Sequence, residues 1–388
     1  MADDMIQITL TGSCAGIEQA LSGVRGVDFG YRCYLSPLPD GQVSLPVFVP
    51  ASEVSALRQA SGPLAVHVLI QRNASAEGRA MQARVMRTLP PGVRRMRGRG
   101  GSSADIIDRY AITNLIDAQF RALAEDHPEH CRTMAMPYRS ARGTPVPLYR
   151  IGVRGPARGG HRGVLITACA YPREWGGAEI CLNLASDLLD AYATGTGLAY
   201  GSVAYGAAQV SQVLEAVDLF VMPCIDPDGR SDSIEFDPLW HDGPATSVPV
   251  SPPLPECRNV AWLLEQFPHI GTVIDIHHYA GDFLHAWNSL VPCDEPATRG
   301  MADGFAATVR GVRGSHYHAR QSALSAPASP TGVHRFKLEY GLEPAFQPDW
   351  PEMGRIIEEI SAGLIAFCFG LAGADTWVEA PLLAAGER

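Results

Sequence analysis

Over the first 72 residues, short apolar segments alternate with polar turns, and their periodicity separates strands from helices. Alternating apolar and polar side chains predict a strand, whereas apolar positions three and four apart predict a helix. By this criterion the predicted strands are residues 6–10, 31–35, 43–49 and 66–70, and the predicted helices are residues 15–21 and 52–59. The expected order of elements is therefore βαββαβ.

The turn between the second and third predicted strands contains the pair Asp40-Gly41. Both residue types tolerate the left-handed backbone conformation that tight hairpins require, so this pair predicts a β-hairpin. The resulting unit resembles a ferredoxin-like α+β domain. Such a fold occurs with many functions and does not by itself indicate one.

The regular pattern ends near residue 75 and is followed by a basic stretch that contains Gly and Pro. Its arginines are Arg84, Arg87, Arg94, Arg95, Arg97 and Arg99. Such a stretch predicts a solvated linker, which we place at residues 76–104, between an N-terminal domain (1–75) and a larger domain (105–388). Docking on an acidic surface, or exposure of a cleavage site, remains an alternative role for these charges.

Beyond the linker, predicted helices alternate with continuous apolar segments at residues 163–168, 219–222, 272–276 and 336–338. Strands without polar alternation are typical of sheets that are covered on both faces. The pattern therefore predicts an α/β domain with a mixed central sheet flanked by helices.

Composition narrows the classes of protein to which this chain can belong. The 388 residues contain 46% hydrophobic positions, no apolar run long enough to span a bilayer, and an N-terminus without the basic region of a secretory signal. The nine cysteines form no paired motif, which favours a reducing compartment. A net charge of −10 disfavours nucleic acid and anionic membranes as partners. We expect a soluble, cytoplasmic protein.

Ionisable residues follow three of the predicted strands. Glu174 comes after the first apolar strand of the large domain, His277 and His278 after the third, and Glu339 after the fourth. Catalytic groups gather at the carboxyl ends of strands in open α/β sheets. Each residue alone also has an ordinary interpretation, since a glutamate at a helix N-terminus complements the dipole and a buried histidine is often only hydrogen-bonded. Adjacent histidines on a strand point to opposite faces, so at most one should face a given site.

Segments in residues 106–370 resemble the zinc carboxypeptidases in order and context. The family's His-x-x-Glu-Trp motif is similar to Tyr171-Pro172-Arg173-Glu174-Trp175. Its Asn-Pro-Asp-Gly turn is similar to Pro223-Cys224-Ile225-Asp226-Pro227-Asp228-Gly229-Arg230. Its Asp-Leu-His-Ser-Tyr segment is similar to Ile274-Asp275-Ile276-His277-His278-Tyr279. The resemblance implies Glu174 and His277 as zinc ligands. It also implies Glu339 as general base for water attack and then acid toward the leaving amine.

Weaker parts of the resemblance lie in loops. Tyr317 precedes Glu339 at a separation similar to that of the family's mobile, substrate-contacting tyrosine, and Leu324 falls where the family determines side-chain preference. The N-terminal unit is similar to the family's pro-domain, which covers the active site until it is cleaved.

Three departures from the family pattern affect the expected chemistry. Tyr171 occupies the position of the first histidine ligand, and a phenol with a pKa near 10 is a poor ligand at neutral pH. His241 replaces the arginine that polarises the scissile carbonyl. Residues 245–254 contain no arginine to clamp a terminal carboxylate, for which Arg230 or Arg258 could substitute.

Three functions are compatible with these residues. The first is a hydrolase of a peptide or small amide, with zinc held by Glu174, His277 and either Tyr171 or a spare histidine, Glu339 as base and His241 as electrophile. The second is a catalytically inactive carboxypeptidase-like protein that binds a peptide or small molecule. The third is a metal-independent acid/base enzyme that uses the same carboxylates with His277 and Tyr171. The substrate and the oligomeric state are left open.

Overall fold

The structure is a computed structural model, and it describes residues 3–29, 36–87, 95–97, 100, 105–107, 110–153, 162–235, 255–278, 281–286, 296–322, 333–341 and 347–373. The chain divides into two compact units, Met1–Met86 and a larger unit that comprises Arg87–Phe236 and Trp240–Arg388. No helix in the described ranges is long and apolar enough to cross a membrane.

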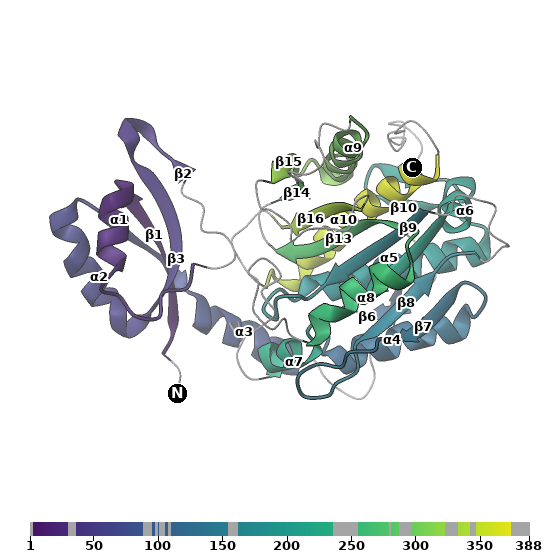
Figure 1. Ribbon diagram of the computed structural model, residues 1–388, viewed down its shortest axis with the longest axis horizontal. Helices are drawn as coiled ribbons and strands as arrows, with labels where there is room; N and C mark the ends of the chain where they lie inside the picture. The colour runs from purple at the N-terminus through teal and green to yellow at the C-terminus, as the bar shows by residue number, and fades with distance from the viewer. Residues whose placement is uncertain are drawn as a thin grey trace. The chain divides into compact units, whose positions relative to one another are not determined.

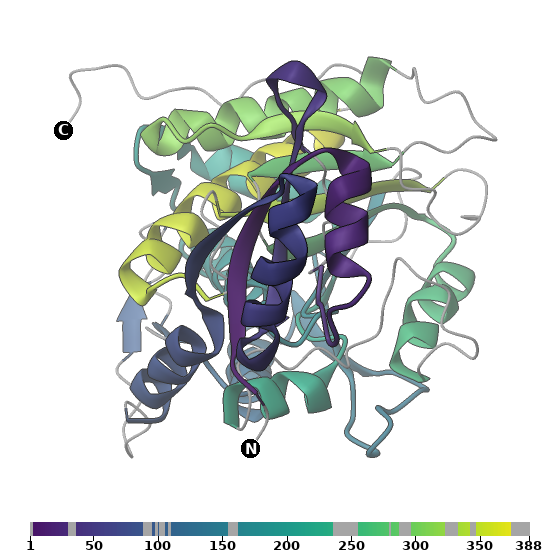
Figure 2. The same cartoon turned by 90° about the vertical axis from the view of Figure 1, so that its left-hand side faces the viewer.

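The N-terminal unit is a four-stranded antiparallel sheet with two helices on one face (Figure 2). The strand order is β2 (Ser36–Pro37), β3 (Val43–Pro50), β1 (Met5–Gly12), β4 (His67–Asn73). Helices α1 (Cys14–Leu21) and α2 (Val54–Ser61) cover a core that includes Ile8, Val47 and Leu57. The predicted elements match, except that the predicted strand 31–35 lies outside the described residues.

The predicted hairpin at Asp40-Gly41 is confirmed. Both residues have left-handed backbone angles, with φ of 62° and 72°. The flanking strands pair antiparallel, with Pro37 opposite Val43. This geometry explains the residue choice, because asparagine, aspartate and glycine are the types that adopt positive φ most readily.

Helix α3 (Ala74–Arg87) crosses the start of the predicted linker. The side chain of Asn73 accepts a hydrogen bond from the backbone nitrogen of Ala76 at 2.8 Å and so satisfies one free donor of the first turn. Residues 76–87 of the predicted linker are therefore helical, and this cap marks where the helix begins. Most of the remaining linker residues lie outside the described residues.

The larger unit contains an eight-stranded mixed sheet (Figure 1). Its strand order is β15 (His318–Ser322), β14 (Asp282–Ala286), β16 (His334–Tyr340), β13 (Ile270–His278), β9 (Arg162–Ala168), β12 (Val217–Met222), β8 (Pro147–Ile151), β7 (Cys131–Ala135). Strands β16, β13, β9 and β12 are parallel neighbours. The antiparallel pairs are β14 with β16, β8 with β12, and β7 with β8. The predicted mixed sheet flanked by helices is confirmed.

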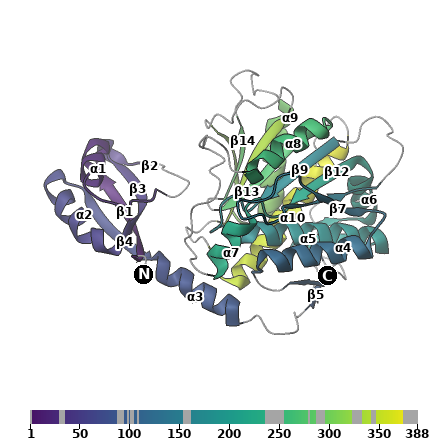
Figure 3. The ribbon, with the colours of Figure 1, turned by 60° about the horizontal axis from the view of Figure 1, so that its bottom comes forward.

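Helices cover both faces of this sheet. They are α4 (Thr113–Asp126), α5 (Gly176–Thr194), α6 (Ala207–Ala216), α7 (Pro227–Glu235), α8 (Arg258–Gln266), α9 (Pro296–Arg313) and α10 (Trp350–Ala372). Figure 3 shows α4 and α5 side by side along the sheet. Helix α10 packs against α5, α6 and α9 and is buried along most of its length.

Aromatic packing fixes α9 and α10 to the sheet. The ring of Phe283 on β14 stacks on Phe305 of α9 at 4.1 Å between centroids and on Phe336 of β16 at 5.0 Å. Phe336 also contacts Phe367 of α10. Because side chains alternate along a strand, Lys337 and Glu339 point to the opposite face from Phe336.

The parallel register brings three strand ends to one edge. Ile276 of β13 lies opposite Ala168 of β9, and His277 lies opposite Glu339 of β16. The remaining short strands, β10 (Leu198–Tyr200) with β11 (Val203–Tyr205) and β5 (Arg95–Arg97) with β6 (Asp105–Ile107), form two-stranded pairs. The residues that follow β9, β13 and β16 therefore lie along one edge of the sheet.

Candidate functional site

Glu174 is positioned by the segment that follows β9. Two backbone hydrogen bonds tie the start of this segment to the end of β12, from Ile225 to the Ala168 carbonyl at 3.0 Å and from Asp226 to the Cys169 carbonyl at 3.2 Å. Cys169 itself has a φ of 53°, a left-handed angle that is strained for a side chain other than glycine. The chain then turns inward, so that Glu174 is only 2% exposed.

His277 lies between two carboxylates at the end of β13. Its Nδ1 is 3.1 Å from Oε2 of Glu174, and its Nε2 is 2.7 Å from Oδ2 of Asp275. The hydroxyl of Thr167, opposite Asp275 in the sheet, donates to Oδ1 of that aspartate at 2.8 Å. One chain of hydrogen bonds therefore runs from Thr167 on β9 through Asp275 and His277 on β13 to Glu174 in the loop after β9.

The charges of this chain are mutually dependent. Burial lowers the pKa of His277, but the nearby charges of Asp275 and Glu174 outweigh burial and raise it to about 9. Burial likewise acts to raise the pKa of Asp275, whereas the cationic His277 brings it below its ordinary value. In this arrangement His277 is an imidazolium at neutral pH and donates a hydrogen bond from each ring nitrogen.

Glu339 forms a second ionic contact beside this chain. Its Oε1 lies 3.0 Å from the ammonium nitrogen of Lys337, two residues earlier on the same face of β16. Lys337 is the only lysine in the chain, and its side chain is 24% exposed, compared with 2% for Glu339. In the sheet register, Lys337 lies opposite Asp275 and Glu339 lies opposite His277.

Tyr171 borders the same group of residues, and His278 does not. The ring of Tyr171 is 3% exposed, and its centroid is 5.1 Å from that of the His277 imidazole. The imidazole of His278 instead packs on Tyr340 at 4.6 Å. A Cβ atom on Gly341 would come within 2.6 Å of His278 Nε2, which explains why glycine occupies that position. The predicted opposite orientation of the two histidines is confirmed.

With this geometry established, comparisons with known proteins become informative. A family model described as zinc carboxypeptidase matches residues 116–295, a range that contains Glu174 and His277. Over these 180 of its 388 residues the chain matches the zinc carboxypeptidase family.

The curated relatives that match this chain are named inactive metallocarboxypeptidases. The inactive metallocarboxypeptidase ECM14 of Ajellomyces dermatitidis is 29% identical over 158 residues, which are 39% of this chain and 24% of that protein. The protein of the same name from Ajellomyces capsulatus is 28% identical over 160 residues, with the same coverage. The chain thus matches only about a quarter of the length of these relatives.

Solved structures of carboxypeptidases share the fold over nearly the whole chain. Thrombin activatable fibrinolysis inhibitor superposes with a TM-score of 0.73 and 15% identity, covering 96% of this chain and 100% of that structure. Carboxypeptidase A from Helicoverpa armigera also gives a TM-score of 0.73, with 13% identity and coverage of 96% and 99%. At these identities the likeness establishes the zinc carboxypeptidase fold alone.

The donors that this chain presents at the positions matching the family's ligands do not complete a zinc site with three ligands. Glu174 and His277 lie close enough to share an ion, but the third family position holds the phenol of Tyr171. Among the described residues, no group of three or more His, Cys, Asp and Glu side chains is arranged to hold a metal ion. A neutral phenol binds a metal weakly unless it loses its proton, so this donor set does not fit the family's metal.

Arg230 does not have the position that the family resemblance implied. It is fully buried, and its guanidinium donates to Oε1 of Glu179 at 2.7 Å and to the carbonyls of Ala111 and Trp175 at 2.8 and 2.6 Å. A buried guanidinium with these partners cannot also clamp a substrate. The structure therefore contradicts its predicted substrate-binding role and makes it a support for the Glu174 segment.

Tyr317 is also placed differently from the prediction. Its side chain is fully buried before β15, and its hydroxyl accepts a hydrogen bond from the backbone nitrogen of Gly341 at 2.8 Å. This placement contradicts a mobile, substrate-contacting tyrosine at this position. The prediction relied on a loop separation, which a change in loop length alters without affecting either strand.

Three other residues were predicted to belong to the site: Arg258, His241 and Leu324. Arg258 is exposed at the start of α8, with its guanidinium carbon 4.0 Å from the centroid of the Tyr138 ring. His241 and Leu324 lie outside the described residues, so their predicted roles as electrophile and specificity residue stay predictions.

Three polar residues of the site were not predicted as site residues: Thr167, Asp275 and Lys337. Alternation along a strand contained the signal, because a side chain two residues before His277 or Glu339 must point to the same face. A lone lysine in an arginine-rich chain was a second signal.

We expect Arg230→Met to destabilise the protein by about 3–5 kcal/mol, because it leaves the carboxylate of Glu179 buried without its counter-charge. Chemical denaturation measures this loss, and an additional Glu179→Leu change should restore much of it. If Arg230→Met alone left stability unchanged but weakened ligand binding, the result would contradict the buried supporting role of Arg230.

Asp226 provides a prediction of pH dependence. Its Oδ1 accepts a hydrogen bond from the backbone nitrogen of Gly229 at 2.8 Å, and burial raises its pKa from 3.8 to about 7. The folded state therefore binds the proton more tightly than the unfolded state, and this contribution to stability declines as the pH rises from about 4 through 7. Asp226→Asn should add about 1–4 kcal/mol at pH 8 and little at pH 4.

The matched control for Asp226 is Asp228. This carboxylate accepts hydrogen bonds from the backbone nitrogen of Arg142 and the hydroxyl of Thr144, and although burial opposes the effect, these contacts lower its pKa. Asp228→Asn should therefore reduce stability at pH 8. Denaturation curves at both pH values test the pair, and a gain from Asp228→Asn as large as that from Asp226→Asn would refute the assignment.

Proposed function

We propose that this chain is a catalytically inactive, carboxypeptidase-like binding protein whose ligand is a peptide or a small amide. The proposed ligand site is the edge formed by the ends of β9, β13 and β16. The match to the family supports the peptide class, and the curated relatives are themselves named inactive. Neither fact identifies the ligand.

One observation carries the proposal. The two side chains that match the family's ligands, Glu174 and His277, hydrogen-bond to each other, and the third ligand position holds the phenol of Tyr171. An imidazolium has no lone pair for a metal, so ion binding would first require removal of a proton that two carboxylates stabilise. Together these features disfavour the activated water on which the family's hydrolysis depends.

The protein's own side chains supply positive charge at this edge. His277 carries one charge between Asp275 and Glu174, and Lys337 carries another beside Glu339. The ammonium of Lys337 is the more exposed of the two, which favours a ligand with a carboxylate or a polarised carbonyl. Glu339, which matches the family's base, is already engaged in an ion pair with Lys337.

A metal-dependent hydrolase remains the second candidate because of Glu174. Within the part of the chain that the structure describes, its Oε1 is buried without a hydrogen-bond partner, and a bound ion would satisfy this atom. On this alternative, Tyr171 would be the third donor and Glu339 the base. The metal-independent acid/base enzyme has no comparable observation in its favour.

Metal content and hydrolysis together separate the candidates. Protein purified after growth with added zinc should contain far less than one zinc per chain, and Tyr171→His should approach one, because it restores a third imidazole or carboxylate donor. Native protein should not hydrolyse N-acylated dipeptides faster than the Glu339→Gln variant does. Elemental analysis and product chromatography are the measurements.

Tyr171→Phe is the matched control, since it keeps the ring and removes only the hydroxyl. About one zinc in the native protein, lost in Tyr171→Phe, would mean that the phenol is a ligand and would support the hydrolase. Turnover that depends on Glu339 and survives strong chelators would instead support the metal-independent enzyme. Either result would overturn the binding-protein proposal.

A further inference from the structure

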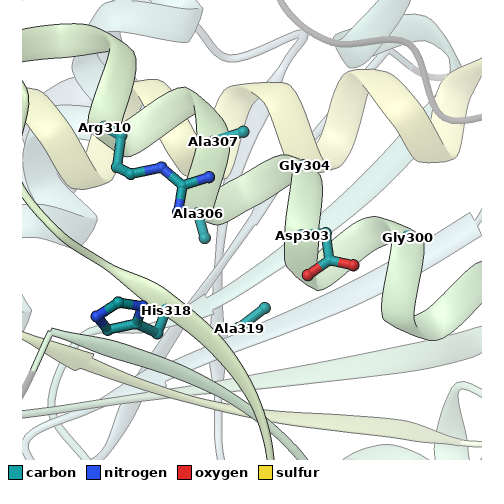
Figure 4. Close-up of a pocket in the computed structure, with 8 residues that line it drawn as sticks. All are labelled: Gly300, Asp303, Gly304, Ala306, Ala307, Arg310, His318 and Ala319. Atoms are coloured by element: carbon teal, nitrogen blue, oxygen red, sulfur yellow. The ribbon is translucent and has the colours of Figure 1, made fainter.

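A pocket separate from the sheet-edge site lies between α9 and β15 (Figure 4). Its volume is about 530 Å³, within the range typical of sites for small organic ligands. It lies along the flank of α9, the helix that packs with α10 on the sheet face opposite Lys337 and Glu339. A ligand here would not contact the residues of the sheet-edge site.

Small residues keep this pocket open. Gly300, Gly304 and Ala307 recur on one flank of α9, and a Cβ atom added to Gly300 would meet nothing within 4 Å. The neighbouring flank of the same helix is fixed by Phe305, which stacks on Phe283. The helix is thus held in place by its buried side, while the flank beside β15 leaves space that no side chain of the described residues fills.

Charges of opposite sign lie at the two ends of the pocket. Arg310 belongs to the last turn of α9, and its Nη1 donates to the Tyr317 carbonyl at 3.3 Å, which orients the guanidinium. His318 is fixed by a backbone hydrogen bond of 3.0 Å to the Gly281 carbonyl. Asp303 lies two turns before Arg310, about 10 Å along the helix axis. Its contact with Arg299 is long, at 3.8 Å, and both side chains are exposed.

We propose that this pocket binds a short peptide of about three residues by its two charged ends. The C-terminal carboxylate pairs with Arg310 and accepts a hydrogen bond from His318, and the N-terminal ammonium pairs with Asp303. An extended chain advances about 3.3–3.6 Å per residue, so three residues, at about 10–11 Å, match the roughly 10 Å between these positions along the helix axis. The small, apolar flank formed by Gly300, Gly304 and Ala307 leaves room for the peptide backbone. The inference does not depend on the function proposed for the sheet edge.

Calorimetric titration with trialanine tests this proposal. We expect trialanine to bind, and Gly300→Leu, which fills the open flank, to abolish binding. Arg310→Gln and Asp303→Asn should each weaken binding about tenfold or more. Because both residues are exposed, these two changes leave folding intact and keep the test valid if Gly300→Leu is unstable. Arg299→Gln is the matched control and should bind as the native protein does.

Blocked peptides assign each end of the ligand. C-terminally amidated trialanine should bind weakly to the native protein and show no further loss in Arg310→Gln, and N-acetylated trialanine should behave in the same way toward Asp303→Asn. No binding of trialanine at millimolar concentrations would overturn the proposal. Binding that is lost in Lys337→Met and retained in Gly300→Leu would also overturn it, because the peptide would then occupy the sheet edge.

Discussion

The imidazole of His277, held between Asp275 and Glu174, is the interaction on which the sheet-edge site depends. Each ring nitrogen faces a carboxylate, at 2.7 and 3.1 Å, in surroundings that exclude most water. In such an environment a charge must be compensated locally, since removing either partner leaves the other buried and unpaired. The site is therefore a closed set of mutually dependent charges, to which Lys337 and Glu339 add a second pair.

The rest of the larger unit fixes the geometry of that interaction. Parallel register aligns Thr167, Asp275 and Lys337 across three neighbouring strands, so their side chains share a face. Behind the Glu174 segment, the buried pair of Arg230 and Glu179 and the hydrogen bond from Trp175 Nε1 to Ser233 at 2.8 Å hold the chain in place. The strained angle at Cys169 persists because these contacts over-determine the turn.

The sequence was most informative where physical constraints are local. Apolar runs predicted β9, β13 and β16 to within a few residues, and Asp40-Gly41 predicted its hairpin, because periodicity and turn chemistry are properties of neighbouring residues. The clustering of Glu174, His277 and Glu339 followed from strand ends that meet at one edge. In contrast, the burial of Arg230 depends on the carbonyl of Ala111, which is distant in sequence, and no local pattern contains that contact. The position of Tyr317 similarly depends on loop length.

The protonation of His277 tests the account most directly. Nitrogen NMR of protein grown with added zinc, labelled at histidine and compared with His277→Gln to assign the signal, reports whether each ring nitrogen carries a proton. The account predicts that at pH 7 both Nδ1 and Nε2 of His277 are protonated, as the two carboxylates require. A deprotonated Nδ1 coordinated to zinc would contradict it and would restore the hydrolytic chemistry of the family.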